Sequence, residues 1–333
     1  MQGITQQKLT LFAANARFIQ KEFLWQGALV KKLAALLYAF DGKPIDCAAI
    51  KRSHALIKDS TGAFSTFRGN MALGVAAMLS LKSDPSELLT NAIAVYEMLK
   101  SAKFRASDYL VVAAYEIASQ AKPEEYGQAV ARARAFYDGM KAKGFFRTRE
   151  NDAIFAAMLG LSDLDVETGT QSVEQLYRRF KPEFWPGNSV QALAQVLVLG
   201  GECETAIDRI LAIRDAMKYQ KIRLDKAYTL PSLGILALLP VDIDALVQAL
   251  DEARAFLKKQ KGFGPLSVSK QALLLFASAI VASAYAEDIK NGVIAASVST
   301  SIASIIIAQQ AAMIAAMSAS AGAAAGAAAA SSG

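Results

Sequence analysis

The chain has 333 residues, of which 53% are hydrophobic and 20% charged, and its formal net charge is +6. This length and composition support a large hydrophobic core. The Lys and Arg residues are spread along the chain without basic runs or interleaved aromatic residues, which argues against nucleic-acid binding. Cys47 and Cys203 stand far apart and outside any ligand-spaced cluster, as expected for reduced thiols. Residues 1–7 lack the pattern of a secretory signal, so we expect a cytoplasmic protein.

An aromatic or aliphatic residue returns every 38 to 41 positions, each time between two helical patterns. A period in this range is typical of helical-hairpin repeats. We therefore predict an all-α chain of about seven repeated helical hairpins of ~40 residues, which form an α/α superhelix or toroid. These marker residues are Phe23, Phe64, Phe104, Phe145, Phe184, Ile222 and Phe263.

The two helices of each predicted hairpin differ in pattern. The first is amphipathic: in residues 88–99 apolar side chains recur near every 3.6 positions, with charged residues between them. The second carries almost no charge and should be buried on nearly all sides, which predicts an inner and an outer layer. The predicted second helices span residues 71–81, 109–118, 153–161, 190–199, 228–239 and 271–281.

The helix starts and the links carry different charges. Ser107, Asn151, Asn188 and Ser267 stand just ahead of second helices, where a side-chain oxygen can cap the first backbone amides. First helices begin in acidic stretches, and the links to the second helices are basic. The pattern predicts one basic rim and an opposite acidic rim.

The C-terminal segment breaks the repeat. No charged residue follows Lys290, and residues 302–317 are strongly apolar. Because Ser304, Gln309 and Gln310 interrupt that stretch, we predict a helix that closes the repeat stack, and we rank a membrane span below it. The predicted domain covers residues 1–318, and residues 319–333 form an Ala/Gly/Ser-rich tail that we expect to be flexible.

No motif for nucleotide phosphates and no metal-ligand spacing is present, so no cofactor, metal site or catalytic residue is predicted. The basic links offer one candidate site. Arg68, Arg105, Arg147 and Arg223 follow the marker residues closely and would lie near second-helix N-termini, an arrangement suited to anions. The alternative is that cations at first-helix C-termini only complement the helix dipole.

A second candidate site depends on whether the hairpins close around a cavity. The polar exceptions on the apolar second helices include Glu116, Gln191, Gln195 and Tyr228. In a ring with a central cavity these residues would line it, whereas in a filled core they would be satisfied by neighbouring backbone. The link around Phe184 and Trp185 is expected to plug one end of the inner layer.

Three stretches carry a resemblance to a known family. They are residues 21–25 (Lys-Glu-Phe-Leu-Trp), the pattern between Tyr96 and Tyr109, and residues 305–313 (Ile-Ile-Ile-Ala-Gln-Gln-Ala-Ala-Met). With these the chain resembles an uncharacterised bacterial family, domain of unknown function number four-thousand-and-three, over nearly its whole length. The resemblance implies no activity.

The links at residues 143–146 (Lys-Gly-Phe-Phe) and 261–264 (Lys-Gly-Phe-Gly) are similar to those of α/α toroids among prenyltransferases and terpene cyclases. That similarity concerns shape. Our first hypothesis is a non-catalytic binding or scaffold protein that uses the basic rim to hold a protein partner or an anionic small molecule. The alternative is an α/α-toroid enzyme or carrier for an apolar or phosphorylated small molecule. Membrane association through residues 291–318 ranks below both.

Overall fold

The computed structural model describes residues 2–143, 152–185, 187–201, 205–226, 228–290 and 305–316. Within these ranges every regular element is a helix and no strand occurs, which confirms the predicted all-α class. None of the helices in these ranges combines the length and the apolar character that a bilayer crossing requires.

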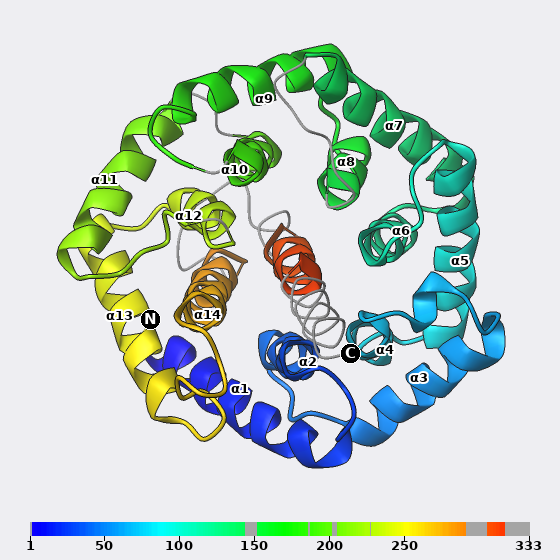
Figure 1. The fold of residues 1–333 in the computed structure, drawn as a ribbon, viewed down its shortest axis with the longest axis horizontal. Coiled ribbons are helices and arrows are strands. Elements are labelled where there is room, and N and C mark those ends of the chain that lie inside the picture. The colour runs from blue at the N-terminus through cyan, green and yellow to red at the C-terminus, as the bar shows by residue number, and fades with distance from the viewer. Residues whose placement is uncertain are drawn as a thin grey trace, which may run out of the picture.

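The helices lie in two layers around a central helix (Figure 1). The two layers alternate along the chain, and α1 packs against α13 and α14, so the first and last hairpins meet. The outer helices are α1 (Gln2–Glu22), α3 (Cys47–Ser60), α5 (Pro85–Ser101), α7 (Tyr126–Ala142), α9 (Val166–Phe180), α11 (Thr205–Tyr219) and α13 (Ile243–Lys259). The inner helices are α2 (Ala28–Phe40), α4 (Ala72–Ser80), α6 (Asp108–Gln120), α8 (Asp152–Leu161), α10 (Gly187–Leu199), α12 (Leu230–Ala237) and α14 (Lys270–Lys290). Two short 3-10 turns, Thr66–Arg68 and Pro123–Glu125, occur in the connections.

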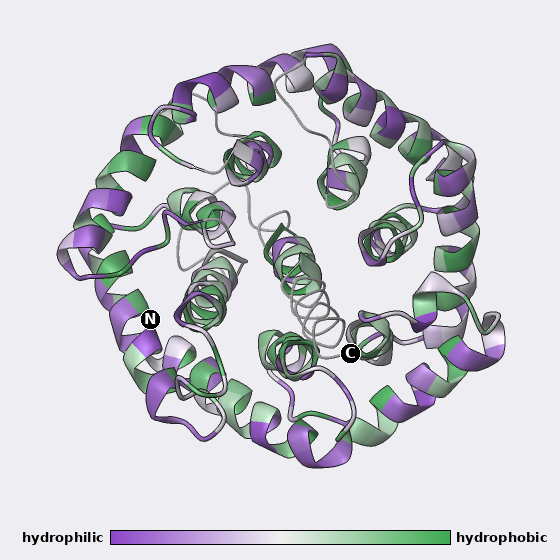
Figure 2. Cartoon of the chain, viewed as in Figure 1, coloured by the Kyte–Doolittle hydropathy of each residue, from purple (hydrophilic) through white to green (hydrophobic). Residues whose placement is uncertain are grey.

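Hydropathy explains the two layers. The inner helices are apolar around most of their circumference, and the outer helices carry polar residues on the side away from the inner layer (Figure 2). In α4 every residue from Ala72 to Leu79 is buried. In α9, by contrast, Val173, Leu176 and Phe180 are buried while Glu167 is exposed. A helix that is apolar on all sides requires neighbours on all sides, which the inner layer provides.

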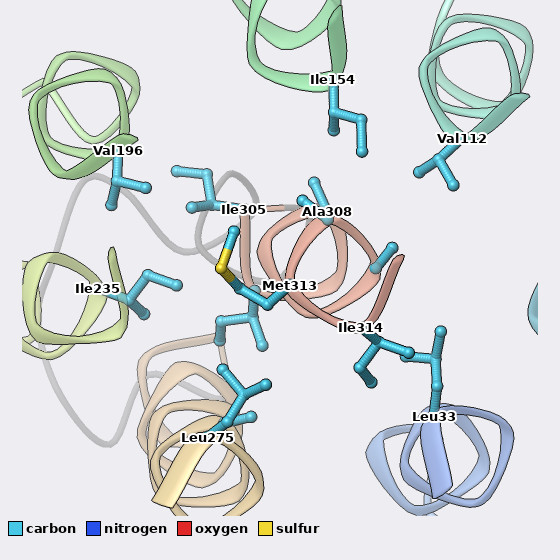
Figure 3. Close-up of a cluster of buried hydrophobic side chains, with 14 of the residues drawn as sticks. Leu33, Val112, Ile154, Val196, Ile235, Leu275, Ile305, Ala308, Met313 and Ile314 are labelled. Carbon is cyan, nitrogen blue, oxygen red and sulfur yellow. The ribbon is translucent and has the colours of Figure 1, made fainter. Parts of the chain in front are cut away.

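Residues 305–316 form a helix at the centre of the ring, which we call the central helix. All of its residues from 305 to 315 are buried except Ile307, which is half-buried. The centre is therefore filled by side chains from the central helix and the inner helices (Figure 3). The inner-helix residues that surround it include Leu33, Val112, Ile154, Val196, Ile235 and Leu275.

Two of the marker residues, Phe104 and Ile222, follow the same kind of outer-helix ending. Lys103 follows α5 with φ of 68° and Lys221 follows α11 with φ of 57°. The next residue then donates its backbone N–H back to the helix: Phe104 N to Leu99 O at 3.1 Å, and Ile222 N to Met217 O at 2.9 Å. This is the Schellman arrangement, in which the residue after the left-handed one packs an apolar side chain against the helix. Phe104 and Ile222 are buried accordingly.

The second marker was assigned to the wrong residue. Phe64 is fully exposed, and Phe67, three positions later, is buried against Tyr96 with ring centroids 5.3 Å apart. The reason is that α3 ends in an extended residue, Thr61, and a longer link with its own 3-10 turn follows. Phe145 lies outside the described residues.

One of the four helix caps predicted ahead of the inner helices is found. Ser107 caps α6, its Oγ accepting from Leu110 N at 3.2 Å. The predicted cap at Ser267 is wrong: Ser269 caps α14 instead, accepting from Ala272 N. Asn188 lies within the first turn of α10, and Asn151 is outside the described residues. At the other ends of the hairpins, aspartate side chains cap outer helices, as expected where the helix dipole favours negative charge. They are Asp46, Asp84, Asp165 and Asp242.

Two arginines on outer helices each donate three hydrogen bonds to backbone carbonyls at the end of an inner helix and just after it. Arg132 of α7 donates to the carbonyls of Gly160, Ser162 and Leu164 at 3.0, 2.7 and 2.6 Å. Arg209 of α11 donates to carbonyls at the same offsets along the chain, at the end of α12. In each case one acceptor carbonyl belongs to the end of the inner helix and two belong to the connection that follows, and the half-buried guanidinium satisfies all three.

Replacement of Arg209 by methionine should lower the free energy of unfolding by about 2 to 4 kcal/mol, because three carbonyls lose a charged donor. Urea unfolding monitored by circular dichroism measures this loss. Replacement of the exposed Arg52 by methionine is the matched control and should stay within about 0.5 kcal/mol of wild type. Equal losses in both variants would show that the contacts of Arg209 contribute nothing.

Candidate functional site

A cavity of about 540 Å³ opens at one end of the inner layer. Its walls come from the last turns of α2, α4 and α6, from α14, from the start of the central helix and from Lys8 of α1. We call it the Glu116 cavity. Three inner helices end at this one cavity, so they run in the same direction and present their C-terminal carbonyls to the same region.

Glu116 is the buried acid of this cavity. Its side chain lines the wall, and only 4% of the residue is exposed. Gln120, one turn later on α6, donates its amide to Glu116 Oε2 at 2.6 Å. Burial raises the pKa of the Glu116 carboxyl to about 7, and the Gln120 hydrogen bond and the charge of Lys82 offset only part of that rise. Near neutral pH the carboxyl is therefore poised between its two protonation states.

The same cavity holds a buried ammonium group. Lys8 is 5% exposed, and its Nζ donates to the Phe40 carbonyl at 2.9 Å and pairs with Glu287 Oε2 at 2.7 Å. Phe40 is the last residue of α2, where the helix dipole is negative. The positive charge of Lys8 is thus paired with the C-terminal end of α2 and with the Glu287 carboxylate.

The other residues predicted to line a central cavity do not belong to the lining of the Glu116 cavity. Gln195 is fully buried and donates to Met140 Sδ at 3.2 Å, towards the outer layer. Gln191 is buried too, and its Nε2 has no partner among the described residues. Tyr228 precedes α12 and is half-buried in the link. These residues were expected to line a cavity only if the ring enclosed one at its centre, and the central helix occupies that place.

The predicted arginine rim lies on the links. Arg68 donates to the carbonyls of Lys58 and Thr61 and so caps the end of α3. Arg223 makes a two-point pair with Asp225, with N–O distances of 2.9 and 3.0 Å. Arg105 is exposed, and Arg147 lies outside the described residues. Arg68 and Arg223 belong to different hairpins and have their own acceptors, which agrees with the capping alternative for Arg68.

The links from outer to inner helices form what we call the link face, which comprises residues 23–27, 61–71, 102–107, 181–185, 220–226, 228–229 and 260–269. Connectivity puts these links at the N-terminal ends of the inner helices, away from the Glu116 cavity. They contain eight basic residues and two acidic ones. The return connections, residues 41–46, 81–84, 121–125, 162–165, 200–201 and 238–242, contain eight acidic residues and three basic ones. In the described links the charge therefore divides as the sequence predicts.

Most of the large exposed apolar side chains lie on the link face or directly beside it, and the others, Phe18 and Met98, lie on α1 and α5. Trp25 is 97% exposed and Trp185 is 77% exposed, whereas Phe184 next to Trp185 is buried. The expected plug is therefore right for Phe184 and wrong for Trp185. The set on or beside the link face is Leu24, Trp25, Phe64, Trp185, Leu266 and, at the end of α11, Tyr219.

Sequence reasoning missed Lys8 and Glu287 as parts of the cavity. They lie at opposite ends of the chain and meet only because the first and last hairpins pack together. The spacing of Glu116 and Gln120, one helical turn apart at a helix end, is the signal that could have identified that pair. Within the described ranges, no three or more His, Cys, Asp or Glu side chains gather as metal ligands would.

The described fold defines a two-layered all-α protein with a polar cavity at one end and basic links at the other. Comparison with family models matches residues 16–311 to the family described as Protein of unknown function (DUF4003). Because the match covers most of the chain, the protein belongs to this family, and that agrees with the resemblance seen in its sequence. Searches of curated proteins and of solved structures each gave no significant match.

Proposed function

We propose that this chain is a non-catalytic binding protein, a closed α/α toroid of seven repeated hairpins, whose link face docks on anionic phospholipid surfaces. The observation that carries the proposal is the combination of exposed Trp, Tyr, Phe and Leu side chains with an excess of basic residues on that face. On this proposal the protein is bacterial and cytoplasmic and meets the cytoplasmic leaflet, which is the anionic one.

The charge supports an anionic surface. Basic side chains near such a surface contribute roughly 1 kcal/mol each to attraction. On the link face the exposed basic side chains are Lys103, Arg105, Lys181, Lys221, Arg223, Lys226 and Lys261. Acidic residues predominate on the return connections. An anionic membrane would therefore attract the link face and repel the face that carries the return connections.

The apolar residues favour a lipid surface over a protein. They come from four different links spread around the ring and from the end of α11 (Figure 1), and the links include those that join α1 to α2 and α9 to α10. A protein interface buries its apolar residues as one contiguous core surrounded by a polar rim. A bilayer interface accepts separate side chains, and Trp and Tyr are the residues that it favours. The proposal does not use residues 305–316, which are buried in the ring.

Sedimentation with vesicles tests the proposal. The protein should sediment with phosphatidylcholine vesicles that contain phosphatidylserine and should stay in solution with phosphatidylcholine alone. Glutamine at Lys103, Lys181 and Lys261 together should weaken binding at least about tenfold, because three favourable charges are lost. The matched control places glutamine at Lys43, Lys82 and Lys122 on the return connections and should bind as wild type does. Binding that is independent of phosphatidylserine, or equally weakened in both variants, would contradict the proposal.

A further inference from the structure

The buried Glu116 carboxyl lacks an ion-pair partner in the described part of the Glu116 cavity. Glu116 accepts a hydrogen bond from the neutral Gln120, and among the described residues no lysine or arginine forms an ion pair with it. Lys82, the other cation of the wall, is exposed, so its charge is largely screened by water. A buried carboxylate without a paired cation is costly, and the missing partner is a positive charge.

One ammonium group, that of Lys8, is already bound in the cavity wall. Lys8 fills one side of the wall, with the Phe40 carbonyl at 2.9 Å and the Glu287 carboxylate at 2.7 Å. A second ammonium beside Glu116 would find the same kinds of partner, a carboxylate and the C-terminal ends of α4 and α6. These helix ends carry partial negative charge, which favours a cation and disfavours an anion.

Apolar side chains form part of the remaining wall, together with polar ones such as Ser119. Leu37, Phe40, Met78 and Ile306 line the cavity beside its charged groups. A volume of about 540 Å³ lies within the range of small-molecule sites, which combine mostly apolar walls with a few polar groups that fix orientation. An aromatic side chain such as Phe40 also suits an organic cation.

We infer that the Glu116 cavity is a binding site for a small organic cation, an amine with an apolar body, whose ammonium group pairs with the Glu116 carboxylate. The site lies at the end of the inner layer away from the link face, so the inference stands apart from the proposed membrane docking.

Binding should be coupled to protonation, since the amine pairs with the ionised carboxylate only. With burial raising the pKa of Glu116 to about 7, affinity should fall as the pH drops below that value. The titratable groups that line the cavity around it are Lys8, Asp41, Lys82, Tyr115 and Glu287. Lys8 is already paired with Glu287 and Asp41 with Lys43, and Tyr115 is neutral because burial raises its pKa.

Isothermal titration calorimetry of the full chain tests the inference. The probes are butylammonium, cyclohexylammonium and phenethylammonium, each with the carboxylate of matching skeleton as its control. We expect saturable binding of at least one ammonium ion above the pKa of Glu116, weaker binding below it, and none of the carboxylates. No saturable binding by any of the three amines, or equal binding of the carboxylates, would overturn the inference.

Two variants localise the binding. Glu116→Gln keeps the shape of the side chain and removes its charge, and it should lower affinity at least tenfold. Met78→Trp keeps the charge and fills the cavity, and it should also abolish binding. The matched control, Glu97→Gln, changes an exposed carboxylate on α5 that pairs with Lys100 and should bind as wild type does. Unchanged affinity in folded Glu116→Gln protein would place the amine elsewhere and overturn the inference.

Discussion

Replacing Ala308 by aspartate should lower the free energy of unfolding by about 3 to 5 kcal/mol, the cost of an uncompensated charge in an apolar interior. Ala308 is fully buried on the central helix, at the middle of the ring (Figure 3). The inner-helix side chains labelled there, such as Val112 and Ile154, are aliphatic, so the new carboxylate would lie among apolar groups. Thermal and urea unfolding monitored by circular dichroism measure the loss.

The matched control is Ala131→Asp on α7, where the residue is exposed and the outer helix faces solvent. That variant should lose only about 0.7 kcal/mol, which is the difference in helix propensity. If Ala308→Asp were as stable as Ala131→Asp, the central helix would not occupy the middle of the ring. The result would then reopen the possibility of a central cavity.

The second large effect concerns Glu116 and pH. The carboxyl titrates near 4.5 when the chain is unfolded and near 7 in the folded state, because burial disfavours its ionised form. Between these pH values the folded state binds more protons than the unfolded state. The free energy of unfolding should therefore fall as pH rises from about 4.5 to about 7, by about 3 kcal/mol in total from this group.

Glutamine at position 116 cannot ionise and should remove this loss. We expect Glu116→Gln to be more stable than wild type by about 3 kcal/mol at about pH 8, and by less than about 1 kcal/mol at about pH 5. Urea unfolding at both pH values, with Glu97→Gln as the control for an exposed carboxylate, gives the comparison. A stability difference independent of pH would show that Glu116 does not titrate between the two values.

Much of the fold can be predicted from the sequence because local chemistry repeats in it. Phe104 and Ile222 recur as markers because a Schellman ending is often accompanied by an apolar residue at that position. The aspartate caps and the basic links recur because each outer helix has the same dipole. Phe64 was misassigned for the same local reason: its link contains an extra turn that shifts the buried aromatic residue to Phe67.

The candidate site could be predicted only in part. Glu116 stands out as a charged residue in an apolar helix, which is a local signal. Lys8 and Glu287 give none, since their contact depends on how the first and last hairpins meet. The position of the central helix also cannot be predicted from the sequence. An apolar segment such as residues 305–316 predicts burial, but periodicity does not say which neighbours bury it.

The tryptophan emission spectrum tests the proposed docking most directly. The chain has two tryptophans, Trp25 and Trp185; both are exposed, on links at different places around the ring. On vesicles that contain phosphatidylserine the emission should shift to the blue and be quenched by brominated lipid, and added salt should reverse the change. The single variants Trp25→Phe and Trp185→Phe should each retain the shift, because both links touch the membrane when the face docks flat. An unchanged, unquenched spectrum at saturating lipid would contradict the account.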